Sequence, residues 1–184
     1  MTVKVSIDSS GGDRGIPVTI EAGIKALGEF QDLQLTFVGD QSSIEAEIEK
    51  HSPSEAITSR IQIVNATEVV LMNESPAIAL RKKKDSSMRV AINLVESNTV
   101  DACVSAGNTG ALMAISRFVL KTIKGIDRPA IMGRMPTMKG HTHMLDLGAN
   151  VDSSPQALLE FATMGSITVE QTEGISNPTV GLLN

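Results

Sequence analysis

The chain alternates short apolar runs with longer segments whose apolar residues recur every three or four positions. The first pattern is typical of buried strands, and the second of helices that pack along one face. Strands are predicted at residues 3–8, 35–40, 61–64, 101–105, 130–132, 144–147 and 180–184. Helices are predicted between them, with starts near Pro17, Ser42 or Ser43, Pro76, Ser86 or Ser87, Asn108 or Thr109, and Ser153 or Ser154.

Apolar strands joined by helical crossovers indicate a parallel sheet covered on both faces. We therefore expect a doubly wound, three-layer α/β/α fold with a mostly parallel sheet, formed as a single domain over residues 1–184. Ligands of such folds bind at the carboxyl ends of the strands. Candidate chemistry is therefore sought in the loops that follow predicted strands.

The strongest candidate is the glycine loop, which reads Ser-Ala-Gly-Asn-Thr-Gly between a predicted strand and a predicted helix. Gly107 and Gly110 let the backbone approach a ligand closely. The first N–H groups of the following helix have no partner within it and attract anions. Ser105, Asn108 and Thr109 add side-chain donors. The alternative is a tight capped turn without a ligand, because the loop matches neither the Walker nor the dinucleotide fingerprint.

A second glycine turn follows the first predicted strand. Gly11 and Gly12 suit a close backbone approach to a ligand, and Asp8 and Asp13 can orient donors or move protons. The alternative is that both aspartates only organise the turn through local hydrogen bonds.

A third strand end carries Asp146, Gly148 and Asn150. Three strand ends with similar residues suggest one shared cleft. The basic run that contains Arg81 and Lys82 is either a solvated helix end or a contact for a phosphate or an acidic partner.

Composition narrows the function classes. The net charge is −5 and the chain lacks Trp and Tyr, which argues against nucleic acid as a partner. No apolar run is long enough to cross a membrane, and the first residues do not resemble a signal peptide.

One cysteine, Cys103, cannot form an internal disulfide, so a reducing cytoplasm is expected. His141 and His143 share one face of an extended segment, but no third ligand stands at a convincing spacing, so no metal site and no cofactor are predicted.

Six segments in order resemble the bacterial phosphate acyltransferases of phospholipid synthesis, the PlsX family. The resemblance spans essentially the whole chain and rests on residues 8–13, 79–88, 105–112, 124–130, 145–152 and 164–166. It departs from the family at Ser9 and Ser10, where Ala-Met is usual. Family members continue well past Asn184, so the resemblance implies an N-terminal portion of a longer fold.

The resemblance implies transfer of a fatty acyl group from acyl carrier protein to inorganic phosphate. It also implies a fold like those of phosphotransacetylases and isopropylmalate dehydrogenases, a homodimer, and a cytoplasmic protein with at most peripheral membrane contact. Phosphate is then expected on the N–H groups of Gly107 to Gly110, neutralised by Arg81 or Lys82. N–H groups near Gly11 and Gly12 are expected to stabilise the oxyanion.

Two other functions stay open. One is a short-chain phosphotransacetylase that uses coenzyme A. The other is a catalytically incomplete fragment that only binds carrier protein or self-associates. A dehydrogenase is disfavoured because no dinucleotide fingerprint follows the first predicted strand.

Overall fold

The computed structural model describes residues 2–148 and 152–183. The chain divides into two compact units, Met1–Lys121 and Thr122–Asn184, where the sequence pattern predicts a single domain. Each unit is described by itself. No helix within the described residues is both long enough and apolar enough to cross a membrane.

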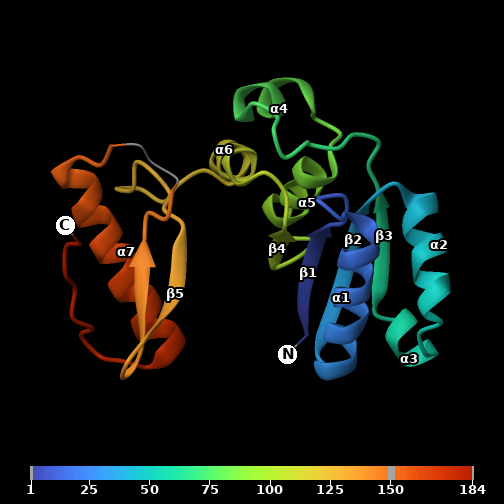
Figure 1. The fold of residues 1–184 in the computed structure, drawn as a ribbon, viewed down its shortest axis with the longest axis horizontal. Helices are drawn as coiled ribbons and strands as arrows, with labels where there is room; N and C mark the ends of the chain where they lie inside the picture. The colour runs from blue at the N-terminus through green and yellow to red at the C-terminus, as the bar shows by residue number, and fades with distance from the viewer. Residues whose placement is uncertain (1, 149–151, 184) are drawn as a thin grey trace. The chain divides into compact units, whose positions relative to one another are not determined.

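The first unit is built on a four-stranded parallel sheet in the order β3-β2-β1-β4. Its strands are β1 (Val3–Asp8), β2 (Leu33–Gly39), β3 (Ile61–Asn65) and β4 (Ala102–Ser105). Its helices are α1 (Ile16–Glu29), α2 (Gln41–His51), α3 (Glu55–Thr58), α4 (Pro76–Lys82), α5 (Ser87–Glu96) and α6 (Thr109–Leu120) (Figure 1). The predicted α/β class with a mostly parallel sheet is confirmed.

Helices cover both faces of this sheet, because successive side chains of a strand point to opposite sides. On one face Leu35 and Phe37 of β2 pack with Ile20 of α1. On the other face Val38 packs with Ala91 of α5. Burial of each large apolar side chain contributes about 1.5–3 kcal/mol, so both helical layers stabilise the sheet.

The strand order places a topological switch point between β1 and β4. From β1 the chain moves through β2 to β3 on one side and then returns to add β4 on the other side. Loops that leave the carboxyl ends of these two strands diverge, and ligands of open α/β sheets bind in the crevice between them. The glycine turn after β1 and the glycine loop after β4 both begin at this point.

Within the described residues, four helices begin at a residue whose side chain caps them, and one of these caps differs from the expected one. Ser86 caps α5, Asn108 caps α6 and Ser154 caps the long helix of the second unit. The expected cap of α2 at Ser42 or Ser43 is wrong. Asp40 holds that position, and its carboxylate accepts a hydrogen bond from the Ser43 amide at 2.9 Å. A carboxylate at an N-cap also faces the positive end of the helix dipole, which favours it over serine here.

The second unit contains β5 (Met132–Thr137), β6 (Gly140–Leu145) and α7 (Pro155–Glu173). β5 and β6 pair antiparallel, with Thr137 opposite Gly140. The expectation that both segments extend the parallel sheet is wrong, because only two residues connect them. A parallel pair requires a crossover of a dozen or more residues, whereas a two-residue turn joins antiparallel strands.

The expected last strand at residues 180–184 is also not seen in its described part, residues 180–183. This segment forms no helix or strand, and Leu182 and Leu183 are 76% and 85% exposed. An apolar run becomes a strand only where another strand offers it a ladder of hydrogen bonds. In the described part of this unit β5 and β6 bond to each other instead.

Candidate functional site at the switch point

Asp8, the last residue of β1, is a buried carboxylate at the switch point. Its side chain is 1% exposed. Oδ1 accepts a hydrogen bond from the Ser87 hydroxyl at 2.6 Å, and Oδ2 accepts one from the Ser105 hydroxyl at 2.7 Å. Ser87 is the first residue of α5, so the positive end of that helix dipole also faces the carboxylate. Asp8 therefore joins β1 to α5 and β4.

The strand register explains why Ser105 reaches Asp8. The two residues are direct partners in the parallel β1–β4 ladder. Ser105 donates its hydroxyl proton to Asp8, and its oxygen accepts the Gly107 amide at 3.1 Å. In this arrangement Ser105 shapes the glycine loop, and its proton is directed away from any ligand above the loop.

The two glycine segments lie against each other. A Cβ added at Gly11 would stand 3.0 Å from the Gly107 nitrogen and 2.6 Å from Asp8 Oδ2. A Cβ added at Gly12 would stand 3.1 Å from the Ala106 carbonyl oxygen, and Gly12 has a φ of +87°. The expected convergence of the first two strand ends is thus seen in the structure, and glycine is required on the β1 side of the contact.

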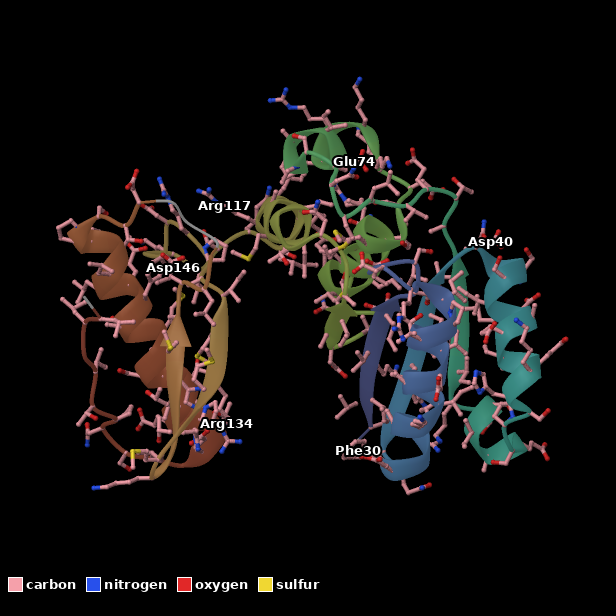
Figure 2. All side chains as sticks on the ribbon, in the orientation of Figure 1. Phe30, Asp40, Glu74, Arg117, Arg134 and Asp146 are labelled. Atoms are coloured by element: carbon pink, nitrogen blue, oxygen red, sulfur yellow. The ribbon has the colours of Figure 1, made fainter. Side chains whose placement is uncertain are left out.

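Asn108 is the structural cap of α6. Its Oδ1 accepts the Ala111 amide at 2.9 Å. Its Nδ2 donates to the carbonyl oxygens of Met72 and Glu74 at 2.9 Å each, and to that of Leu71 at 3.3 Å. Figure 2 labels Glu74 on the segment that leads into α4. Both ends of the amide are therefore engaged, and Asn108 fastens this segment to the glycine loop.

The first turn of α6 contains the exposed part of the loop. Thr109 and Gly110 are both exposed, whereas Gly107 and Asn108 are buried. The amides of Thr109 and Gly110 have no partner within the helix, since they precede its first i−4 bond. Together with the Thr109 hydroxyl they present donors at the positive end of the α6 dipole, a combination that suits an anion.

The remaining first-unit candidates lie at the edges of this site. Asp13 is exposed in the turn before α1. Arg81 and Lys82 are exposed in the last turn of α4. A Cβ added at Gly110 would stand 2.9 Å from Pro76 Cγ, so it is the opposite, amino end of α4 that contacts the loop. The two cations therefore lie at the far end of that helix.

The third predicted strand end belongs to the second unit. Asp146 follows β6 with a φ of +66°, and its Oδ2 accepts a hydrogen bond from the Ser153 hydroxyl at 2.9 Å. Asn150 lies outside the described residues. The expectation that β6 ends at the same sheet edge as β1 and β4 is wrong, because β6 pairs only with β5 among the described strands.

Two features escaped the sequence reading. The sequence pattern predicts Ser87 only as a possible helix cap, whereas its hydroxyl donates directly to Asp8. The expectation that His141 and His143 lack a third ligand is also wrong, because Glu173 of α7 contacts both rings. Hydrogen bonds with His143 and then His141 hold the pKa of Glu173 below its ordinary value. Only the packing of α7 on the hairpin reveals this group.

Cys103 of β4 is a poor nucleophile. Burial raises the pKa of its thiol to about 11, and the negative charge of Asp8 acts in the same direction. The thiol is therefore protonated at neutral pH, as expected of a small core residue.

A hollow of about 530 Å³ lies beside the β1 turn, lined in part by Ser10, Gly15 and Lys50. It lies on the α1 and α2 side of the turn and does not include the glycine loop.

Comparison with known proteins connects this site to a family. Residues 3–184 match the model of a family described as fatty acid synthesis protein. The phosphate acyltransferase of Ruthia magnifica subsp. Calyptogena magnifica is 77% identical over 184 residues, all of this chain and 54% of that protein. The phosphate acyltransferase of Vesicomyosocius okutanii is 75% identical over the same shares, and that of Janthinobacterium sp. (strain Marseille) is 59% identical over 51% of its length. The chain spans about half the length of the curated relatives it matches.

Among solved structures, the EutD phosphotransacetylase from Staphylococcus aureus has a similar fold. The TM-score is 0.65 at 18% sequence identity, over 95% of this chain and 54% of that one. At this identity the likeness concerns the fold alone. The family match, by contrast, covers all but the first two residues, and the relatives align with the entire chain. This chain therefore belongs to the fatty acid synthesis protein family, with phosphate acyltransferases as its curated relatives.

Proposed function

We propose that this chain takes part in transfer of a fatty acyl group from acyl carrier protein to inorganic phosphate, with acyl phosphate as the product for phospholipid synthesis. The observation that carries the proposal is the exposed first turn of α6 at the switch point. The curated relatives are phosphate acyltransferases, which supports an anion site of this kind.

In this proposal phosphate binds on the amides of Thr109 and Gly110, with the Thr109 hydroxyl as a third donor. Backbone donors suit the dianion because they add positive potential without a long side chain that must be immobilised. Asp8 lies beneath the loop, where its two oxygens accept the hydroxyl protons of Ser87 and Ser105. These three side chains fix the loop beneath the ligand.

The reaction is a nucleophilic substitution at the thioester carbonyl. A phosphate oxygen forms a bond to the carbonyl carbon, and the carbonyl oxygen becomes an oxyanion. The segment of Gly11 and Gly12 lies against the glycine loop, and the proposal assigns that charge to the Gly12 amide, because the Gly11 amide already donates to the Asp8 carbonyl oxygen at 3.3 Å. Collapse of the intermediate breaks the carbon–sulfur bond, and the carrier thiolate leaves and takes up a proton. Phosphate is itself the nucleophile, so the protonated Cys103 is not needed.

The proposal gives other predicted residues supporting roles. Asn108 positions the donors by capping α6. Arg81 and Lys82, exposed at the far end of α4, suit a contact with acidic carrier protein better than a contact with phosphate. The proposal also includes a contribution to the site from Asp146, Asn150 or a second protomer. It further includes a cytoplasmic location of the protein.

The test measures acyl phosphate formation by the purified chain, with phosphate and a long-chain acyl carrier thioester. Thr109→Val keeps the shape of the side chain and removes its hydroxyl. A hydrogen bond to a charged group is worth about 1.5–3 kcal/mol, so the KM for phosphate should rise roughly tenfold or more. Thr99→Val is the matched control, because Thr99 is exposed at the opposite end of β4.

Three results would overturn the proposal. The first is a Thr109→Val enzyme with an unchanged KM for phosphate, which would show that phosphate does not bind at the glycine loop. The second is faster turnover of acetyl coenzyme A than of the carrier thioester, which supports a short-chain phosphotransacetylase. The third is carrier-protein binding without any acyl phosphate, which supports a chain that binds but does not catalyse.

A further inference from the structure

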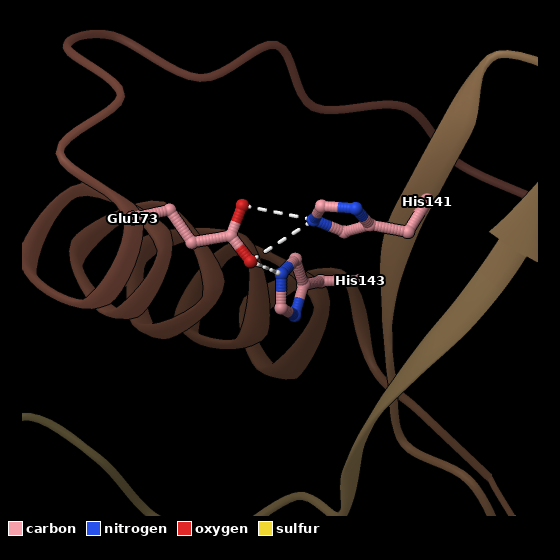
Figure 3. A group of neighbouring side chains, drawn as sticks. All are labelled: His141, His143 and Glu173. Atoms are coloured by element: carbon pink, nitrogen blue, oxygen red, sulfur yellow. Dashed lines mark hydrogen bonds and ion pairs between the residues drawn. The ribbon is translucent and has the colours of Figure 1, made fainter.

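We propose that His141, His143 and Glu173 form a binding site for Zn²⁺ on the second unit. One ligand atom from each residue lies within 4.8 Å of the other two. Figure 3 shows the Glu173 carboxylate facing both imidazole rings. The site lies in a different unit from the glycine loop and is independent of the acyl transfer proposed above.

Two elements hold the three ligands. His141 and His143 are two residues apart on β6, so both point to the same face of the hairpin. Glu173 is the last residue of α7. Its Oε2 lies 2.9 Å from His141 Nε2, and its Oε1 lies 2.8 Å from His143 Nε2. Zinc bonds of about 2.0–2.2 Å in tetrahedral geometry separate ligand atoms by about 3.3–3.5 Å, so each of these two nitrogen–oxygen distances needs to open by only about half an ångström.

The donor set specifies the class of ion. Two imidazole nitrogens with one carboxylate are ligands that Zn²⁺ accepts, and three protein ligands leave a fourth position for water. Mg²⁺ and Ca²⁺ prefer oxygen ligands, so this group disfavours them. The side chains of His141, His143 and Glu173 are 29%, 15% and 19% exposed, which shields the ion while leaving an entry path.

Arg134 on β5 competes with the metal. Its Nη2 lies 2.9 Å from His141 Nδ1, and its Nε lies 3.8 Å from Glu173 Oε1. A guanidinium only donates, so His141 Nδ1 accepts here and Nε2 carries the proton. Zinc on Nε2 transfers that proton to Nδ1, and Arg134 must then turn away. Its side chain is 62% exposed, so it has room to do so.

At His143 no hydrogen bond from the described residues to the second ring nitrogen has to break when zinc binds. Its Nδ1 is buried and has no hydrogen-bond partner among the described residues. Binding of zinc at Nε2 moves the ring proton to Nδ1, and that atom is unpartnered in either tautomer. The shift therefore exchanges one unsatisfied group for another.

The test is Zn²⁺ binding by the tag-free chain, measured by chelator competition, with Co²⁺ absorption as a reporter of nitrogen and oxygen ligands. His143→Ala and Glu173→Gln should each weaken Zn²⁺ by more than tenfold. His51→Ala is the matched control, because His51 lies on α2 beside Glu47 and should leave the affinity unchanged. Arg134→Gln should tighten Zn²⁺ roughly tenfold, the lower end of typical outer-shell effects.

The unfolding temperature of each variant separates loss of the ligand from loss of the fold. Equal Zn²⁺ affinity in the wild type, His143→Ala and Glu173→Gln proteins would overturn the proposal. So would a wild-type Co²⁺ complex whose spectrum matches that of the free ion. Loss of binding in His51→Ala would assign the metal to α2 and would equally reject the site.

Discussion

A carboxylate removed from water is tolerated only when hydrogen bonds replace its hydration. Asp8 meets this requirement through the hydroxyls of Ser87 and Ser105, one on each oxygen. Neither serine is a sequence neighbour of Asp8. The residues that hydrogen-bond to this carboxylate are thus brought together only by the fold. Loss of either hydrogen bond should therefore destabilise the switch point.

Ser87→Ala should lower the free energy of unfolding by about 1.5–3 kcal/mol, because one oxygen of a buried carboxylate loses its donor. Urea denaturation measures the loss. Ser42→Ala is the matched control, since Ser42 donates to Asp40 at 2.8 Å in an exposed position and its removal should cost less than about 1 kcal/mol. Equal losses in the two variants would contradict the account of Asp8.

At the scale of elements, the start of α2 depends on hydrogen bonds between residues close in sequence. Asp40 caps α2 and lies at its first turn in Figure 2. Hydrogen bonds from the hydroxyls of Ser43 and Ser42 and from the Ser43 amide lower the pKa of Asp40 from its ordinary value of 3.8. A lowered pKa in the folded state means that the folded protein holds this proton less tightly than the unfolded chain does.

This cap should give α2 an acid-sensitive contribution to stability. The contribution is complete above pH 3.8 and is lost as pH falls through the lower folded pKa. Asp40→Asn keeps the cap, because Asn caps helices about as well as Asp, but does not titrate. The stability advantage of the wild type over Asp40→Asn should therefore shrink as the pH falls below 3.8 in urea titrations. A difference that is constant with pH would contradict the prediction.

The elements that the sequence predicted well are those with local signals. β1 ends at Asp8 as expected, and Asn108 caps α6 as one of two expected residues. The hairpin is not predicted from the sequence, because its apolar residues resemble those of a buried parallel strand and the apolar pattern does not mark the two-residue turn before Gly140. The partners of Asp8 and the approach of Glu173 to the histidines depend on contacts across 30 to 97 residues, which periodicity does not encode.

At the scale of the whole molecule, the chain consists of two units, and the boundary between them falls after Lys121. The first unit contains the parallel sheet and the glycine loops. The second contains the hairpin, α7 and the histidine group. Each has its own internal contacts, so the segment that joins them is the natural place for a protease to enter.

Limited trypsin digestion should cut first at Lys121 or Lys124, which are both exposed just after α6. Arg128 should resist, because Pro129 follows it. The expected early product is an intact fragment that begins at the amino terminus and ends at one of these lysines, identified by mass spectrometry. First cuts inside residues 1–120 would show that the first unit is not the more resistant body.

The distance along the chain between Asp8 and its partners also has a consequence in time. Ser87 follows it by 79 residues and Ser105 by 97. At a synthesis rate of about 5–20 residues per second, Ser87 and Ser105 have both been synthesised only roughly 5–20 seconds after Asp8. Until then β1 lacks β4, and the nascent sheet cannot close around the carboxylate. A substitution that weakens this hydrogen-bond set should therefore lower the yield of folded protein in cells as well as its stability once folded.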